Sequence, residues 1–150
     1  MRSLGHALGK ALIAAAGPPM VVTLQGELGA GKTTLAGGVL NALGFAGPAR
    51  SPTYTLIEPY ETAALHLYHL DLYRLSDASE VEALGIRDLL SERAVLLIEW
   101  SERGTGRLPG ADLQISISYG AAAETRVVRL IAATSAGSRL LDDVALASVQ

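Results

Sequence analysis

The sequence predicts an α/β fold in three layers, with helices on both faces of a mixed parallel and antiparallel sheet. Residues 20–24 form an apolar, β-branched run that leads into a glycine-rich loop and then a helical pattern. Residues 94–98 are a second continuous apolar run, which is typical of a buried central strand. Residues 113–119 alternate strictly between apolar and polar, and residues 126–131 more loosely, so we expect two neighbouring antiparallel strands there.

The first two helices follow from apolar spacing and from the residues that end them. We expect an amphipathic helix over residues 4–16, because Gly17-Pro18-Pro19 then breaks the pattern. After the glycine-rich loop, apolar residues recur at helical spacing from Leu35, and Gly44 supplies a stop. This order places one helix before the first strand and one directly after the loop.

The middle and the end of the chain predict a hairpin and more helices. Residues 53–60 and 65–72 are two extended stretches, close enough in sequence to pair as a hairpin. Three further helices are expected: one that starts at Asp77 or Ser79 and runs through Leu84 before Gly85, a short one over residues 87–90, and a final one over residues 138–149.

The amino-acid composition favours some classes of protein and excludes others. A chain of 150 residues that is 49% hydrophobic predicts one folded domain over residues 1–150. The net charge of −3 argues against non-specific binding of nucleic acid, and the lack of cysteine excludes disulfides and thiolate metal sites. No apolar run reaches the ~18 residues that a membrane span needs. Residues 4–16 are apolar, but Gly5, His6, Gly9 and Lys10 interrupt the run, which argues against a signal sequence. We therefore expect a cytoplasmic protein.

Residues 26–34 contain the complete P-loop pattern G-x-x-x-x-G-K-[ST], and the strand and helix around them are the context that this motif needs. The amides of the loop and the positive end of the following helix should face bound phosphates. Lys32 should reach the β- and γ-phosphates, and the Thr33 hydroxyl should ligate Mg²⁺. The alternative is a plain glycine-rich turn beside a lysine. The residues are Gly26, Glu27, Leu28, Gly29, Ala30, Gly31, Lys32, Thr33 and Thr34.

The motif and its context favour a P-loop NTPase-like sandwich, in which the nucleotide sits at the C-terminal ends of the parallel strands. Glu99 ends the apolar run of residues 94–98, where many P-loop enzymes carry an acid. It can hold Mg²⁺, hold a Mg²⁺-bound water, or accept a proton from attacking water. The alternative is a solvated glutamate at the end of a strand.

Two other segments carry candidate residues with open alternatives. Thr53 and Thr55 follow Pro52, and they either sense the γ-phosphate or simply favour strand geometry. Asp71 either orients water or a Mg²⁺ ligand, or forms a structural pair with Arg74. His66 and His69 are three apart in an expected strand and should face opposite sides, which argues against a metal pair.

The absence of guanine-binding motifs favours ATP over GTP. The only lysines are Lys10 and Lys32, and neither lies in an N-K-x-D or T-K-x-D pattern. No D-x-x-G pattern follows the switch-like segment that contains Thr53.

Taken together, the motifs resemble the bacterial TsaE (YjeE-like) ATPases over residues 20–110. The matching segments, in order, are residues 26–34, Ser51-Pro52-Thr53-Tyr54-Thr55, His69-Leu70-Asp71-Leu72-Tyr73-Arg74, Leu84-Gly85-Ile86-Arg87-Asp88, Ile98-Glu99-Trp100 and Gly104-Thr105-Gly106-Arg107-Leu108-Pro109.

The resemblance implies a weak ATPase that acts with a TsaB–TsaD heterodimer in threonylcarbamoylation of adenosine 37 of ANN-decoding tRNAs. It implies Thr33 and Glu99 as Mg²⁺ ligands, Thr53 in a switch-like loop, and Asp71 near the γ-phosphate or its water. Trp100 would lie beside the site, and residues 2–6 are candidates for contacts with adenine.

Two other functions remain open from the sequence. A small-molecule kinase would share the P-loop, but it needs an acceptor pocket and an arginine-bearing lid, for which Arg87, Arg93, Arg103 and Arg107 are candidates. A nucleotide-gated binding module would hydrolyse ATP only incidentally. Since the chain offers no obvious arginine finger, we expect slow hydrolysis that partners accelerate.

Overall fold

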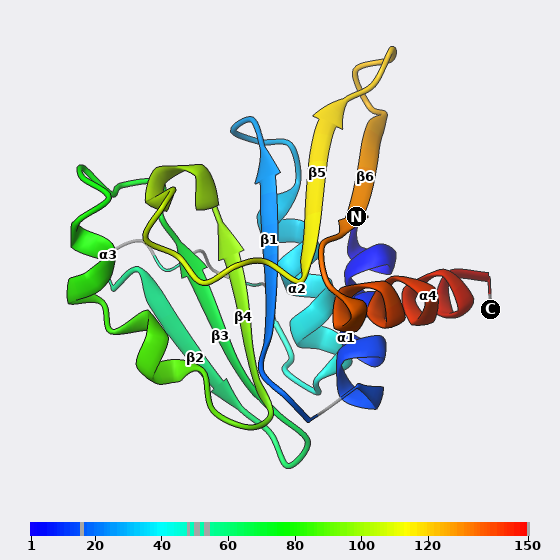
Figure 1. Ribbon diagram of the computed structural model, residues 1–150. Helices are drawn as coiled ribbons and strands as arrows, with labels where there is room; N and C mark the ends of the chain where they lie inside the picture. The colour runs from blue at the N-terminus through cyan, green and yellow to red at the C-terminus, as the bar shows by residue number, and fades with distance from the viewer. Residues whose placement is uncertain (16, 48, 50–51, 53–54, 150) are drawn as a thin grey trace.

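A computed structural model describes residues 1–15, 17–47, 49, 52 and 55–149. Its core is a six-stranded sheet in the order β2-β3-β4-β1-β5-β6 (Figure 1). The four inner strands run parallel, and the edge strands β2 and β6 pair antiparallel with β3 and β5. The strands are β1 (Met20–Gly26), β2 (Ile57–Glu61), β3 (His66–Asp71), β4 (Ala94–Glu99), β5 (Leu113–Tyr119) and β6 (Arg126–Ala132).

The burial of each strand explains its sequence pattern. Every residue of β4 is buried, so this strand is apolar without interruption until its final glutamate. Strand β5 alternates between buried and less buried positions, as its alternating sequence predicts. The sheet has a hydrophobic core on each face. Successive residues of a central strand belong to different cores, since Val21 packs on one face of the sheet and Val22 on the other.

Helices cover the two faces of the sheet unequally. Helices α1 (Arg2–Ala14), α2 (Lys32–Ala42) and α4 (Ser135–Val149) lie together on one face and enclose the larger core (Figure 1). The other face has only the short α3 (Glu80–Ala83) and the 3₁₀ turns η1 (Ile86–Leu89) and η2 (Ser101–Gly104) among the described residues. The third layer is therefore thin, and Val127 and Ile131 of β6 are 56% and 47% exposed.

The predicted α/β fold and its mixed sheet are confirmed, as are the hairpin of β2 and β3 and the pairing of β5 with β6. The predicted start of the last helix was wrong, because α4 begins at Ser135 rather than Ser138. The Thr134 hydroxyl accepts the N–H of Gly137 and caps this earlier turn. Gly137 fits inside the turn because a Cβ there would lie 1.8 Å from the Asp112 carbonyl oxygen.

The first helix also differs from its predicted range, since α1 spans Arg2–Ala14 rather than residues 4–16. It packs closely on α2: a Cβ at Gly5 would lie 2.0 Å from the Leu35 carbonyl oxygen, so only glycine permits this approach. Among the described residues, no helix is both long enough and apolar enough to cross a lipid bilayer.

Candidate nucleotide site

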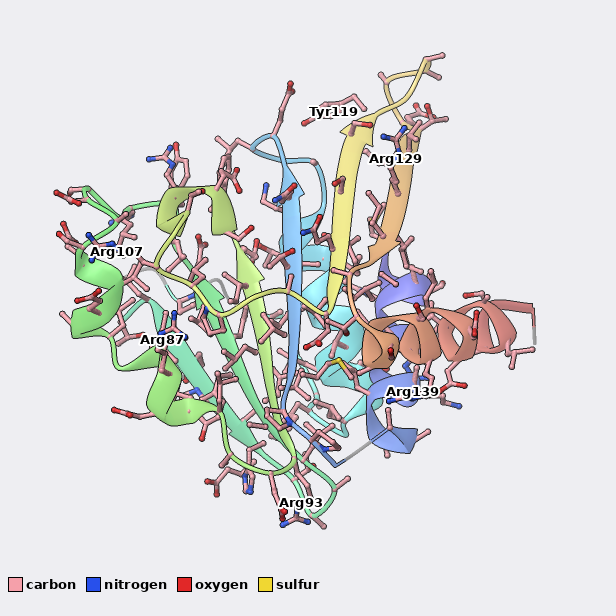
Figure 2. All side chains as sticks on the ribbon, in the orientation of Figure 1. Arg87, Arg93, Arg107, Tyr119, Arg129 and Arg139 are labelled. Atoms are coloured by element: carbon pink, nitrogen blue, oxygen red, sulfur yellow. The ribbon has the colours of Figure 1, made fainter. Side chains whose placement is uncertain are left out.

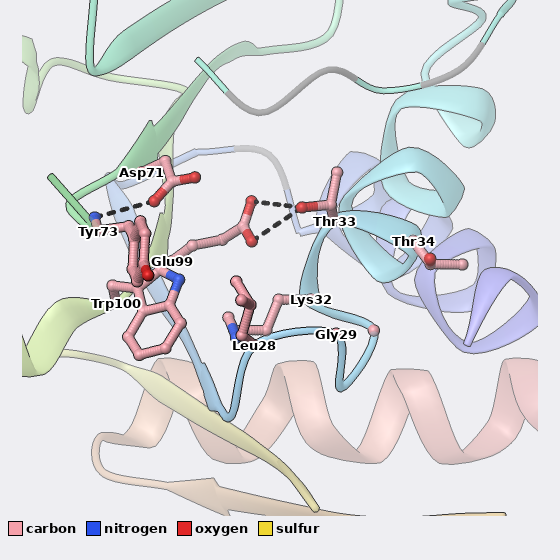
Figure 3. Close-up of a pocket in the computed structure, with 10 residues that line it drawn as sticks. Leu28, Gly29, Lys32, Thr33, Thr34, Asp71, Tyr73, Glu99 and Trp100 are labelled. Carbon is pink, nitrogen blue, oxygen red and sulfur yellow. Dashed lines mark hydrogen bonds between the residues drawn. The ribbon is translucent and has the colours of Figure 1, made fainter. Parts of the chain in front are cut away.

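The P-loop connects the end of β1 to the start of α2, as the sequence predicts. Gly29 and Gly31 have φ angles of +79° and +120°, which favour glycine over residues with a side chain. Helix α2 begins at Lys32, so its free amides point toward the loop. The loop forms one wall of a cavity of about 200 Å³, whose lining is Leu28, Gly29, Gly31, Lys32, Thr33, Thr34, Asp71, Tyr73, Glu99 and Trp100 (Figure 3).

Strand register brings the two predicted acids to this cavity. Asp71 at the end of β3 is opposite Glu99 at the end of β4, and Glu99 is opposite Leu24 near the end of β1. The carboxyl ends of three neighbouring parallel strands therefore meet beside the P-loop. Asp71 Oδ1 accepts the backbone N–H of Tyr73 at 3.0 Å, which fixes one carboxylate oxygen (Figure 3).

Lys32 is only 5% exposed and lies inside the loop. Its ammonium donates to the carbonyl oxygens of Gly26 at 2.5 Å and Glu27 at 3.0 Å. It also lies 4.2 Å from the centre of the Trp100 ring. Burial lowers the pKa of Lys32 below its ordinary value, although the carboxylates of Glu99, Glu102 and Asp71 oppose this shift.

Glu99 is not a solvated glutamate, since it is 2% exposed. The Thr33 hydroxyl donates to its carboxylate, with oxygen–oxygen distances of 3.1 and 3.4 Å (Figure 3). His69 Nε2 lies 2.6 Å from the carboxylate at Oε2. Thr33 and Glu99, the residues predicted to share a metal, are thus already in direct contact.

His69 is the site residue that the sequence did not reveal. It is fully buried on β3 opposite Leu97, and Leu97 and Glu99 point to the same face of β4. The contact with Glu99 is therefore a diagonal pair between strands, and only the register of β3 and β4 could have indicated it. No described residue hydrogen-bonds to His69 Nδ1. Because an ionised carboxylate only accepts, His69 donates to Glu99 from Nε2.

Trp100 closes one side of the cavity in an unusual backbone conformation. Its φ of +58° is left-handed, and such strain in a residue with a side chain is typical of functional sites. Its ring lies 4.9 Å from the Tyr73 ring, and the Arg103 guanidinium lies over both rings, at 5.7 Å from Trp100 and 5.4 Å from Tyr73. The expectation that Trp100 lies beside the P-loop agrees with this geometry.

The other candidate site residues either lie away from the first cavity or are not among the described residues. Thr53 is outside the described residues, and its role stays a prediction. The Thr55 hydroxyl donates to the carbonyl of Ile57 at 3.1 Å and makes a local turn. His66 lies near Glu61, at a nitrogen–oxygen distance of 3.8 Å, at the other end of β3 from the P-loop.

A second cavity of about 500 Å³ adjoins the first, because Thr33 and Thr34 line both. Arg2, Gly37, Asn41, Gly47 and Ala49 complete its described lining. Arg2 is one of the predicted adenine contacts, and His6 approaches Asn41 with a nitrogen–oxygen distance of 3.1 Å.

The residues at the first cavity fit a magnesium nucleotide. The hydroxyl of Thr33 and the carboxylate of Glu99 are oxygen ligands, which Mg²⁺ prefers. In the described parts of the chain, no group of three or more His, Asp or Glu side chains could enclose a metal. Such a sparse set suits Mg²⁺, because this ion usually keeps waters and takes other ligands from phosphates.

Comparison with known proteins identifies the family of this chain. A family model described as "Threonylcarbamoyl adenosine biosynthesis protein TsaE" matches residues 2–128. A TsaE protein of Haemophilus influenzae is 48% identical over 122 residues, which cover 81% of this chain and 76% of that protein. A TsaE protein of Bacillus subtilis is 42% identical over 111 residues, with 74% and 69% covered. The crystal structure of Bacillus YdiB superposes with a TM-score of 0.72 at 29% identity, covering 97% of this chain and 90% of YdiB.

Proposed function

Because the chain belongs to the TsaE family of threonylcarbamoyl adenosine biosynthesis proteins, we propose that it is a Mg²⁺-dependent ATPase of that pathway. In this proposal it supports the modification of adenosine 37 in ANN-decoding tRNAs, together with a TsaB–TsaD heterodimer. The observation that supports the ATPase best is the convergence of the P-loop, Asp71 and Glu99 at one edge of the sheet.

The P-loop amides and the start of α2 would bind the triphosphate. Lys32 now donates to two neutral carbonyls, so a phosphate would offer its ammonium a stronger, charged acceptor. The second cavity is the proposed place of the adenine base, with Arg2 and Asn41 in its lining.

Thr33 and Glu99 would hold the metal through their oxygens. Mg²⁺, when bound, neutralises charge that develops on the phosphates. His69 would keep the Glu99 carboxylate in place by donating from Nε2, and Asp71 would orient the attacking water or accept its proton. Thr53 is the proposed γ-phosphate sensor.

Slow intrinsic turnover follows from the positions of the arginines. None of the described residues that line the first cavity is an arginine, and the Arg103 guanidinium lies over the Tyr73 and Trp100 rings. Since an arginine that contacts the transferring phosphate accelerates such reactions strongly, a partner that supplies one would complete the site.

The kinase alternative receives little support from the structure. Arg93 donates to the Ala63 carbonyl at the opposite end of the sheet, and Arg107 pairs with Glu82 (Figure 2). Arg87 lines a separate cavity beside Arg107. None of these three could act as a lid over the P-loop without a large rearrangement.

The test combines calorimetry with turnover. ATP and Mg²⁺ should bind the purified protein with measurable heat, and TsaB–TsaD from the same organism should accelerate phosphate release. No heat with Mg²⁺-ATP on folded protein would refute the nucleotide site. Binding without any effect of TsaB–TsaD on turnover would refute the partner assignment.

A further inference from the structure

The hairpin of β5 and β6 contacts the P-loop from the side opposite to the acids. In the sheet, β1 lies between β4, which ends in Glu99, and β5. Gly26 is the last residue of β1 to pair with β5, opposite Ile117, so Tyr119 lies beside the loop that follows. Tyr119 (labelled in Figure 2) and Arg126 form the last pair of the hairpin register.

Both side chains of this pair donate to carbonyls of the P-loop. Tyr119 Oη donates to the Leu28 oxygen at 3.1 Å, and Arg126 Nε donates to the Ala30 oxygen at 3.1 Å. The Arg126 guanidinium lies 4.3 Å from the centre of the Tyr119 ring. It also donates to the carbonyls of Ala123 and Thr125, both at 2.9 Å, so the hairpin itself holds it in place.

Peptide geometry connects these carbonyls to the phosphate site. The Leu28 carbonyl shares its planar peptide with the N–H of Gly29, and the Ala30 carbonyl shares its peptide with the N–H of Gly31. In a trans peptide the N–H points away from the carbonyl oxygen. Holding the two oxygens toward the hairpin therefore turns the amides of Gly29 and Gly31 away from it. Both glycines line the first cavity, which neither Tyr119 nor Arg126 lines. On the other side of the loop, the same glycines and Arg126 line a separate cavity of about 430 Å³.

Gly29 and Gly31 are also the residues whose backbone conformation most needs the hydrogen bonds from Tyr119 and Arg126. Without a Cβ, glycine can adopt several backbone conformations besides the positive φ angles seen here, and both residues lie between β1 and α2, outside any regular structure. The exposed Tyr119 ring, at 45% exposure, adds little to the core. Its contact with the loop is therefore the more informative feature.

We propose that Tyr119 and Arg126 are positioning residues for the phosphate site, which orient the amides of Gly29 and Gly31 toward the phosphates of the nucleotide. This inference rests on the proposed binding of ATP and adds two residues from the far end of the chain to it. Neither residue needs to touch the nucleotide.

The test uses the full-length protein and three variants of increasing severity: Tyr119→Phe, Arg126→Gln and the double variant. Arg129→Gln is the matched control, because it removes the same charge from the same strand at an exposed position. Calorimetry with Mg²⁺-ATP gives the affinity, steady-state kinetics give KM and kcat, and thermal unfolding gives stability. Amide NMR signals of Gly29 and Gly31 report on the loop without any nucleotide.

Loss of one hydrogen bond should weaken ATP binding about fivefold, and loss of both about 25-fold if they act independently. KM should rise while kcat at saturation stays within about twofold, and the Gly29 and Gly31 signals should shift. Arg129→Gln should match the wild type in all readouts.

Three results would overturn the inference in different ways. If Arg129→Gln weakens binding as much as Arg126→Gln, the effect is one of net charge. If the double variant binds ATP within about twofold of the wild type, the hairpin does not orient the loop, although the proposed function stands. If the wild type gives no heat with Mg²⁺-ATP, the proposed function falls and this inference falls with it.

Discussion

Replacing His69 tests whether this buried ring holds the carboxylate of Glu99. In His69→Leu the ring is exchanged for an apolar side chain, so Glu99, at 2% exposure, keeps only the Thr33 hydroxyl among its described side-chain donors. A hydrogen bond to a charged group contributes about 1.5–3 kcal/mol. For a chain of this size, each 1 kcal/mol lowers the melting temperature by about 2–4 °C. We therefore expect His69→Leu to melt about 3–12 °C below the wild type.

The assay is thermal unfolding without nucleotide or Mg²⁺, so that only the protein's own contacts contribute. His69→Gln should recover most of the loss, because its amide can donate from a position close to that of Nε2. His66→Leu is the control on the same strand, and its less buried ring should cost no more than about 0.5 kcal/mol. In a Glu99→Gln background the cost of His69→Leu should fall to about half, since the acceptor is no longer charged.

Two outcomes would refute this reasoning. His69→Leu could melt at the same temperature as the wild type, which would mean that the contact with Glu99 contributes nothing. Alternatively, the cost of His69→Leu could be the same in the wild-type and Glu99→Gln backgrounds, which would mean that His69 acts only through packing.

The remaining predictions concern the nucleotide. Lys32→Ala should lose at least about tenfold in ATP affinity by calorimetry, because it removes the one charged donor of the loop; unchanged affinity would contradict the assignment. Asp71→Asn and Glu99→Gln should lose phosphate release by at least about 100-fold with a much smaller loss of binding, because their roles concern water and metal; an equal loss of binding in all three variants would undercut these roles. The affinity of the free protein for nucleotide without Mg²⁺ should be constant at neutral pH and fall at alkaline pH, starting below the ordinary lysine value of 10.5, because burial lowers the pKa of Lys32 and only its protonated form donates to phosphate. A pH titration of affinity, with Lys32→Arg as the variant that stays charged, checks this. The same lowered pKa makes the unfolded state bind more protons in that pH range, so the nucleotide-free protein should gain stability there as pH rises.

Local patterns were sufficient for the part of the site that is continuous in sequence. The P-loop could be predicted because one strand, one loop and one helix carry the whole motif within residues 20–44. The acid at the end of β4 could be predicted for a similar reason, since the apolar run of that strand marks its own end. The position of Asp71 opposite Glu99 could not be read from the sequence, because it depends on the register of β3 and β4. Its role in catalysis stays a prediction.

The residues that were missed act across strands, and strand order is not a local property. His69 begins one of the segments that resemble the TsaE family, but its contact with Glu99 was not predicted, because it depends on β3 and β4 being neighbours. The early start of α4 depends on the Thr134 cap and on the close approach of Gly137 to the Asp112 carbonyl. Asp112 and Gly137 are far apart in the chain, so their contact could not be read from a local pattern. Pairing of β5 with β6 was predicted, but their contact with the P-loop depends on β5 lying next to β1.

The central place of β1 in the sheet gives the P-loop two flanks of different chemistry. On the β4 flank, Lys32 and Glu99 are buried charges that a magnesium nucleotide would neutralise, so this flank should rearrange when ligand binds. On the β5 flank, Tyr119 and Arg126 bind neutral carbonyls, whose hydrogen bonds a nucleotide does not need to replace. In the proposed function, the β4 flank would respond to phosphate and metal, while the β5 flank would keep the amides of the P-loop in position.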